Sequence, residues 1–238
     1  MKRLVTFMLA VLVAFLAGSS SGSSNAWAQD KQPEHKLIEF HMALLKHGPS
    51  YNAAGMPKDL KAQHIQNVMT LLESGKAVIA GPLADEGDIA GILIFRAKSA
   101  EEALGWAEND PAVRAGFFKA EMHPWWSEDV MKTPVSPIKL TTAYLAFLTR
   151  GAKWTPEKTA ATEELQKAHI ANIVRLADLK KLVVAGPFGD GGTLRGIFVF
   201  KVGSLEEART LAETDPAVKA GRLALEIHPW MVPQGVLP

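Results

Sequence analysis

The sequence contains no cysteine among its 238 residues. Disulfide bonds, thiolate nucleophiles and zinc–thiolate sites are therefore excluded, and packing alone must stabilise the fold. A strong charge of either sign is also missing, because 26 basic residues stand against 25 acidic ones. A nearly neutral chain without a basic run gives no sign of binding nucleic acid. Neither G-x-G-x-x-G nor G-x-x-x-x-G-K-[ST] occurs, so the sequence indicates no nucleotide phosphate site and no cofactor.

The first 28 residues have the pattern of a secretory signal peptide. Lys2 and Arg3 form a positive start, residues 4–17 are an apolar run, and residues 26–28 read Ala-Trp-Ala, which is typical of a cleavage site. The run is shorter than the roughly 20 apolar residues that a membrane span needs. We expect cleavage before Gln29, which leaves 24 basic and 25 acidic residues and a formal charge of −1. The mature protein is then predicted to be periplasmic or secreted, with no membrane contact.

The rest of the chain contains an internal repeat. Residues 64–125 align with residues 169–230 at a constant offset of 105, without a gap. Roughly half of the aligned positions are identical, which is far more than a chance periodicity gives. The identical positions include His64 and His169, Gly81-Pro82 and Gly186-Pro187, Ser99 and Ser204, Asp110-Pro111 and Asp215-Pro216, and Pro124-Trp125 and Pro229-Trp230. We therefore expect one domain at 37–126, a proline-containing linker at 127–139 and a second domain at 140–232.

Each copy follows a β-α-β-β-α-β pattern. In the first copy, the apolar patterns predict strands at 37–45, 77–80, 91–96 and 117–123. A helical apolar pattern predicts a helix at 58–74. Ser99 caps the second helix, with Glu102 completing a capping box, and Asp110-Pro111 ends that helix. Gly81-Pro82 predicts a turn after the second strand. The order is the split-βαβ, ferredoxin-like pattern of an α+β fold. Its helices cover one sheet face, so the two bare faces are expected to pack together as an intrachain pseudo-dimer.

These residues, at this order and spacing, resemble the YCII-related family. That family has a histidine early in its first helix, a Gly-Pro after strand two, a serine-capped second helix ending in D-P-x-V-x-A-G, and a Pro-Trp or Pro-Phe on its last strand. The corresponding residues in the first copy are His64, Gly81-Pro82, Ser99, Asp110-Pro111, Val113, Ala115-Gly116 and Pro124-Trp125. The resemblance implies a pseudo-dimeric α/β barrel, a class that includes muconolactone isomerase and dehydrochlorinases of chlorinated hydroxyquinones. It also implies a histidine–aspartate pair as the catalytic element, although family members usually have one domain.

The strongest chemical candidates are the pairs His64–Asp110 and His169–Asp215. Two antiparallel helices on one sheet face bring the start of the first near the end of the second, where these residues stand. A carboxylate beside an imidazole fixes its tautomer and raises its basicity, as a general base near neutral pH requires. The alternative is structural, because an aspartate before proline often bonds the backbone at a helix end.

A second set of polar residues lies on the last strands. Period two places Glu121 with His123, and Glu226 with His228, on the face away from the apolar residues that meet the helices. His41 and Tyr144 occupy equivalent places on the first strands. We interpret these six residues as substrate-binding groups of a polar pocket between the sheets, and hydrogen bonds between the copies are the alternative. Their spread does not predict a metal site.

Two smaller expectations accompany this set. Asp85 and Asp190 recur in the hairpin between strands two and three, where a turn favours aspartate. Trp125 and Trp230 are expected to pack where the two copies meet, since large aromatic residues mainly contribute burial.

Two functions are consistent with the sequence. The first is an enzyme of lyase or isomerase type, with His64 and His169 as bases and Asp110 and Asp215 orienting them, acting on a small unsaturated or aromatic substrate. The second is a non-catalytic periplasmic module that binds a small molecule or a partner in the pocket between the sheets. The sequence leaves the ligand and further oligomerisation open.

Overall fold

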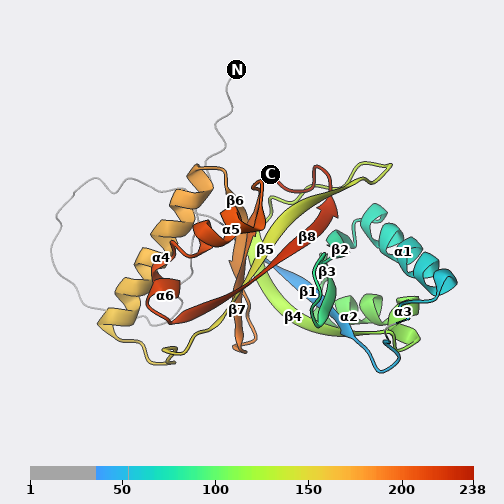
Figure 1. The fold of residues 1–238 in the computed structure, drawn as a ribbon, viewed down its shortest axis with the longest axis horizontal. Helices are drawn as coiled ribbons and strands as arrows, with labels where there is room; N and C mark the ends of the chain where they lie inside the picture. Colours follow the sequence, from blue (N-terminus) through green and yellow to red (C-terminus); the bar gives the residue numbers. More distant parts are fainter. Residues whose placement is uncertain (1–35, 53) are drawn as a thin grey trace, which may run out of the picture.

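The computed structural model describes residues 36–52 and 54–238 (Figure 1). The expected signal peptide, residues 1–28, lies outside the described residues. Within the described part, no helix combines the length and the hydrophobicity that crossing a membrane demands.

The two halves of the chain repeat one series of elements. The first half contains β1 (Leu37–His47), α1 (Lys58–Glu73), β2 (Ala77–Pro82), β3 (Ile89–Phe95), α2 (Ala100–Glu108), α3 (Pro111–Arg114) and β4 (Phe118–Glu128). The second half contains β5 (Leu140–Arg150), α4 (Ala160–Asp178), β6 (Leu182–Pro187), β7 (Leu194–Phe200), α5 (Leu205–Ala212), α6 (Pro216–Lys219) and β8 (Leu223–Pro233). Each half forms an antiparallel four-stranded sheet, ordered β2-β3-β1-β4 and β6-β7-β5-β8. The prediction of two ferredoxin-like domains is therefore confirmed.

The helices lie on the outer sides of the molecule and the two sheets lie between them (Figure 1). Alternation along β1 explains this, because Phe40, Met42 and Leu44 point to the other sheet while Ala43 and Leu45 point to the helices. Both faces of each sheet are thus apolar, as a sheet buried on both sides requires. The space between the sheets is filled by a core with side chains from both halves.

The sheets also meet at their edges. Ala84 N–H donates to the Pro229 carbonyl oxygen at 2.8 Å, and Gly189 N–H donates to that of Pro124 at 2.9 Å. These bonds bring β2 beside β8 and β4 beside β6, which closes the two sheets into one barrel. Two seams, defined by the β2–β8 and β4–β6 contacts, therefore hold the halves together without leaving open strand edges there.

The repeated tryptophans stand at these seams, as expected. Trp125 and Trp230 are fully buried. The Trp125 indole N–H donates to the Gly186 carbonyl oxygen and that of Trp230 to the Gly81 carbonyl oxygen, both at 3.1 Å. Each indole therefore joins its own last strand to the second strand of the other half.

The repeated Gly-Pro does not form the turn that the sequence predicts. Gly81 and Gly186 are residues of β2 and β6, not of a turn after them. A Cβ atom on Gly81 would lie 1.7 Å from the Met231 carbonyl oxygen, and one on Gly186 would lie 1.8 Å from that of Trp126. Glycine is required because the backbones of the two halves touch at the seam. The edge position of β2 and β6 in their own sheets explains why proline is tolerated next to each glycine.

Three local features also differ from their predictions. Ser99 caps α2, but the Glu102 carboxylate accepts from Lys98 N–H rather than from Ser99, so the expected capping box is displaced by one residue. Asp110 ends no helix: α2 stops at Glu108, and Asp110 is the N-cap of the next helix, α3. Finally, β4 continues to Glu128, two residues into the predicted linker, because it pairs with β1 over its whole length.

Replacement of Gly81 by alanine should destabilise the whole molecule. The added methyl collides with backbone that cannot move without opening the β2–β8 seam, so we expect a loss of about 3 kcal/mol in the free energy of unfolding. Urea denaturation followed by tryptophan fluorescence measures this change.

The matched control is Gly105→Ala in the interior of α2, where a Cβ would meet nothing within 4 Å. Helix propensity predicts a gain of about 1 kcal/mol there. Equal effects of the two substitutions would contradict the close approach at the seam.

Candidate functional site

His64 and Asp110 are in direct contact. The His64 Nδ1 atom lies 2.9 Å from both carboxylate oxygens of Asp110. Asp110 is buried, and its carboxylate also accepts from Ala112 N–H at 2.9 Å and from the Asn67 side-chain amide at 2.8 Å. Because a carboxylate can only accept, Nδ1 must carry the proton that it donates to Asp110. In the neutral imidazole the other ring nitrogen, Nε2, then has a lone pair.

The fold explains how residues 46 positions apart meet. His64 lies in the second turn of α1, and Asp110 caps α3 directly after α2. The aspartate is held by its capping bond, since the backbone around Pro111 is restricted. The same carboxylate therefore caps a helix and contacts the histidine, so both predicted interactions of this aspartate occur.

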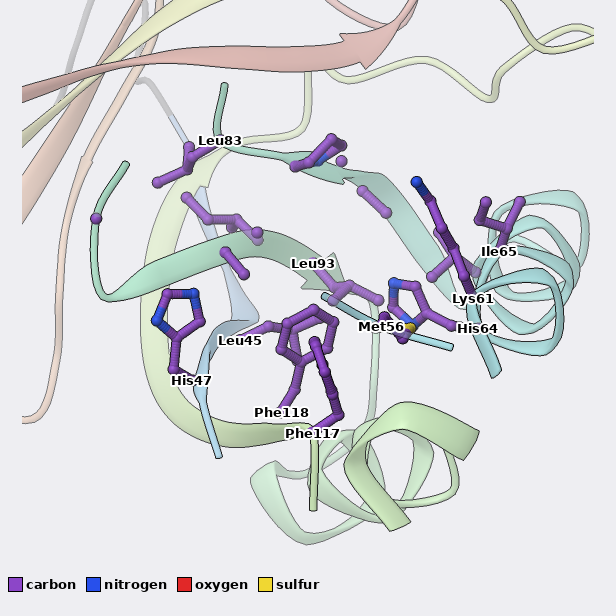
Figure 2. A pocket seen from close by; sticks show the side chains of 18 of the residues that line it. Leu45, His47, Met56, Lys61, His64, Ile65, Leu83, Leu93, Phe117 and Phe118 are labelled. Atoms are coloured by element: carbon purple, nitrogen blue, oxygen red, sulfur yellow. The ribbon is translucent and has the colours of Figure 1, made fainter. Parts of the chain in front are cut away.

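His64, whose Nδ1 atom is turned to Asp110, lines a cavity of about 1070 Å³ (Figure 2). The cavity is bounded by α1, by β2 and β3 with their hairpin, and by the loop before α1. Most of its wall is apolar, and its polar side chains include Lys61, which lies beside His64 on α1 (Figure 2). Among the described residues, Nε2 of His64 has no hydrogen-bond partner. A ligand in the cavity can therefore approach His64 without displacing a protein partner of Nε2.

The second half builds the same pair in a more closed form. His169 Nδ1 lies 2.8 Å from Asp215, which is fully buried and accepts from Ala217 N–H at 2.9 Å. The ring of Phe198 stacks on the imidazole of His169 with centroids 5.9 Å apart. The equivalent residue in the first half is Leu93, which lines the cavity. The side chain of His169 is 10% exposed, against 18% for His64.

Asn67 and Asn172 complete the two pairs, and sequence reasoning missed them. The Asn172 amide approaches Asp215 at 3.4 Å, as that of Asn67 approaches Asp110. Each asparagine stands three residues after the histidine, one turn along the same helix face, and both copies contain it. That repeated H-x-x-N spacing is the signal that identifies them.

The histidines of the last strands lie at the seams, each between two carboxylates. His123 contacts Glu121 at 3.0 Å and Asp190 of the other half at 2.6 Å. His228 likewise contacts Glu226 at 3.2 Å and Asp85 of the other half at 2.7 Å. The recurrence of Asp85 and Asp190, interpreted from sequence as turn chemistry alone, was the signal for this contact.

His41 and Tyr144 do not join this set, which corrects their predicted place between the sheets. In the β1–β4 ladder, His41 pairs with Pro124 while Met42 pairs with His123. Paired residues share a face, so His41 lies on the helix side, where Tyr144 also packs in the second half. The more apolar side of β1 faces the barrel interior, whereas the sequence interpretation placed the polar residues there.

An expected pocket between the sheets is replaced by apolar packing. Phe40, Met42 and Trp125 from the first half and Phe147 and Trp230 from the second fill the barrel interior. The seam histidines lie beside this core, so their contacts agree with the alternative of hydrogen bonds between the copies. The described residues contain no group of three or more histidine, aspartate or glutamate side chains arranged to hold a metal ion.

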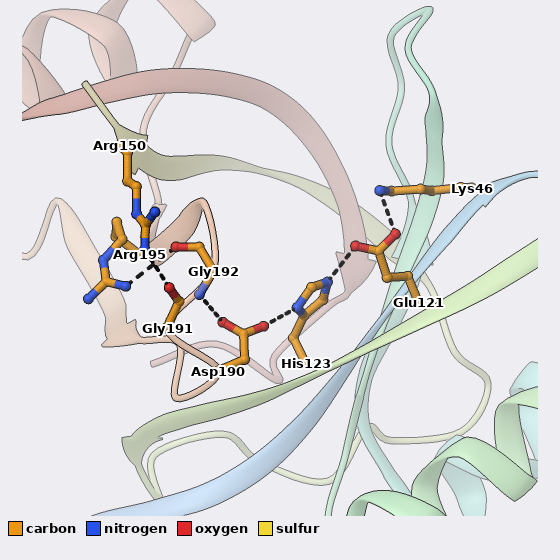
Figure 3. A network of polar contacts seen from close by, with 8 residues as sticks. All are labelled: Lys46, Glu121, His123, Arg150, Asp190, Gly191, Gly192 and Arg195. Carbon is orange, nitrogen blue, oxygen red and sulfur yellow. Dashed lines mark hydrogen bonds and ion pairs between the residues drawn. The ribbon is translucent and has the colours of Figure 1, made fainter. Parts of the chain in front are cut away.

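A chain of polar contacts runs across the β4–β6 seam (Figure 3). It begins at Lys46, whose ammonium donates to Glu121 at 2.6 Å, and continues through His123 to Asp190. The Lys46 hydrogen bond is the main cause that holds the pKa of Glu121 below its usual range, with a smaller contribution from His123. Partial burial raises the pKa of Asp190, but hydrogen bonds from His123 and Gly192 N–H outweigh it and lower the pKa overall.

Comparison with known proteins identifies both halves as copies of one domain. The model of the YCII-related domain matches residues 39–125 and again residues 147–231. The uncharacterised protein YjpA of Bacillus subtilis (strain 168) is 36% identical over 76 residues, which are 30% of this chain and 87% of YjpA.

Solved structures resemble the whole tandem arrangement. A mutant chlorite dismutase from Candidatus Nitrospira defluvii has a TM-score of 0.55 at 13% identity, over 84% of this chain and 92% of the other. A putative chlorite dismutase has a TM-score of 0.50 at 11% identity, over 84% and 95%. At these identities the likeness shows the fold alone, which is the two-domain α/β barrel.

Acid should weaken the β4–β6 seam. A carboxyl group whose pKa is lower in the folded than in the unfolded state stabilises the fold above its unfolded pKa, and this stability is lost as the pH falls through the folded value. For Glu121 and Asp190 this loss of stability begins at about pH 4. The Glu121→Gln/Asp190→Asn variant should therefore start less stable at pH 7 and lose less stability between pH 6 and pH 3, measured by thermal unfolding.

The control is Glu206→Gln on the exposed start of α5, outside the polar chain. It should follow the pH dependence of the unmodified protein. Parallel curves for all three proteins would contradict a contribution of these carboxylates to the seam.

Proposed function

The chain belongs to the YCII-related family, and from this premise we propose that its first half is an enzyme of lyase or isomerase type. The substrate is a small unsaturated or aromatic molecule, and the reaction moves a proton through His64. One observation carries the proposal: His64 lines a cavity while its Nδ1 atom is held by a buried carboxylate.

Each residue has a distinct role in this reaction. His64 Nε2 accepts the proton of the substrate, and the imidazolium that forms is stabilised by the negative charge of Asp110. Asp110 is a positioning residue, because it reaches the substrate only through His64. The amide of Asn67 fixes the carboxylate in turn, so the imidazole ring has one preferred orientation.

The cavity supports a small and largely apolar substrate. Its volume of about 1070 Å³ is at the upper end of the range of ligand pockets. Leu45, Val68 and Leu93 supply apolar wall. Lys61 brings a positive charge beside His64, and the β2–β3 hairpin brings negative charges to the far side of the cavity through Asp85, Glu86 and Asp88. A lysine near the base favours negative charge that develops on the substrate after proton removal.

The second half serves as the scaffold in this proposal. The ring of Phe198 covers the imidazole of His169, where Leu93 leaves space beside His64. The His169–Asp215 pair then joins α4 to α6 as a buried structural contact. Both copies then keep the pair for different reasons: the first pair is catalytic and the second pair is structural.

The alternative is a non-catalytic module that binds a small molecule. Its favouring observation is the mainly apolar wall of the cavity, which provides affinity without chemistry. The site of binding is then this cavity, not the apolar space between the sheets. Ligand binding would stabilise the His64→Gln variant as much as the unmodified protein.

Deuterium exchange tests the enzymatic proposal. A panel of small lactones, enols and hydroxyaromatic acids is incubated with the protein in deuterated buffer, and NMR follows deuterium incorporation and isomerisation. His64→Gln should slow the reaction at least about 100-fold, because it removes the general base. His169→Gln is the matched control and should retain the rate within a few-fold.

Three outcomes are informative. Equal losses in both variants would contradict the division between the halves. A rate that His64→Gln leaves unchanged would overturn the base. A panel compound that raises the melting temperature of both variants equally, without turnover, would favour the binding module.

We also propose that the chain is exported. The support is the pattern of residues 1–28, with its positive start, apolar run and Ala-Trp-Ala end. Expression of the full chain in a bacterium should yield a periplasmic protein that begins at Gln29, which intact-mass spectrometry identifies. Ala28→Phe should block cleavage, because the enzyme that removes signal peptides requires a small residue there. Full-length protein in the cytoplasm of the unmodified strain would contradict export.

A further inference from the structure

Three arginines of the second half surround one tryptophan. Arg150 ends β5, Arg195 lies in β7, and Arg222 directly precedes β8. The central guanidinium carbons of these residues lie 3.9, 5.8 and 5.9 Å from the ring centre of Trp154. Three positive charges from separate segments of the second half therefore share one indole, which attracts cations through its ring. We call these three residues the arginine cluster.

The arginine cluster has no carboxylate partner among the described residues. Its hydrogen bonds go to neutral oxygens: Arg150 donates to the Gly191 carbonyl at 2.6 Å and Arg195 to the Gly192 carbonyl at 3.4 Å. Arg222 donates to the side-chain oxygen of Thr155 at 3.1 Å and to its carbonyl at 2.7 Å.

Elsewhere in the chain, basic side chains form ion pairs with carboxylates. Arg96 forms a two-pronged ion pair with Asp129, and Lys181 pairs with Glu207 at 2.8 Å. The acid near the arginine cluster is Asp190, but its carboxylate is already bonded to His123 across the seam (Figure 3). The negative charge of Asp190 offsets only part of the three positive charges, so the cluster keeps an excess of positive charge.

This arrangement costs stability in the absence of an anion. Burial is the main cause that lowers the pKa of Arg195, and repulsion from Arg150 lowers it further. Asp190 opposes this shift, and Arg222 adds a smaller lowering effect. Like charges that are brought together and partly shielded from water repel each other. A bound anion would remove this repulsion and occupy the remaining guanidinium N–H groups.

The first half has no such charge at the equivalent place. Its residues at the positions of Arg150, Trp154 and Arg222 are His47, Tyr51 and Phe117, and Ala90 stands where the second half has Arg195. There the rings of His47 and Tyr51 stack with their centroids 3.5 Å apart, and the ring centroids of Tyr51 and Phe117 are 5.2 Å apart. The barrel can thus be built without arginine here, so the fold itself does not demand the cluster.

We propose that Arg150, Arg195 and Arg222 form a binding site for an oxyanion, the phosphate or carboxylate group of a small molecule. Planar guanidinium groups bind such oxygens in pairs, which gives both affinity and direction. The site is separate from His64, which lies in the other half, and it stands or falls independently of the proposed reaction.

Calorimetry and thermal unfolding test the site in the full mature chain. Inorganic phosphate and malonate are titrated in parallel at low salt, with sodium chloride at equal ionic strength as the reference. At least one of the two anions should bind and raise the melting temperature beyond the effect of chloride. Tighter binding of phosphate assigns a phosphate group, and tighter binding of malonate assigns a carboxylate.

The variants Arg195→Gln and Arg222→Gln should each weaken anion binding at least tenfold. Without anion, both variants should be as stable as the unmodified protein or more stable, because each relieves repulsion within the cluster. Arg209→Gln on the exposed face of α5 removes the same charge elsewhere and should leave binding unchanged. Binding that is equal in all four proteins, or no stabilisation of the unmodified protein beyond that by chloride, would overturn the site.

Discussion

The contact of backbone with backbone at the two seams is the constraint on which the rest of the structure depends. Gly81 and Gly186 let β2 and β6 approach the last strand of the other half so closely that no side chain fits between them. The buried indoles of Trp125 and Trp230 then bond to the carbonyls of these same glycines. With the edges closed, an apolar barrel interior forms from side chains of both halves, and neither sheet has to face water.

Closure of the barrel also decides where chemistry is located. Because the interior is packed, polar groups are left at the seams and on the helix sides of the sheets. The seam carries His123 and His228 between carboxylates of both halves, which joins the halves by polar contacts as well as by packing. The helix side holds the pairs of His64 and His169, whose surroundings differ through single positions such as Leu93 and Phe198. The two copies of the domain therefore have the same fold but different surroundings around the equivalent histidines.

The sequence predicted the repeated fold and its strand order because both follow from local periodicity and self-similarity. It also placed His64 near Asp110, since the topology alone brings the ends of the two helices together. It failed for His41 and Tyr144, because alternation separates two faces of a strand but does not say which face meets the other sheet when both are apolar. The seam role of Gly81 was equally hidden, because its cause is a backbone 150 residues away, at Met231.

The carboxylate of Asp110 shows why structural and chemical interpretations of a repeated residue are compatible. A carboxylate has about four acceptor sites, and one oxygen is sufficient for the cap of α3. The capping bond and the amide of Asn67 immobilise the group, and this immobility makes it a useful partner for His64. A free aspartate would lose conformational entropy each time it oriented the ring, whereas a capping aspartate has already lost it on folding. The same cap occurs at Asp215, so retention of the pair in both halves follows from folding, and its use as a base depends on the cavity beside it.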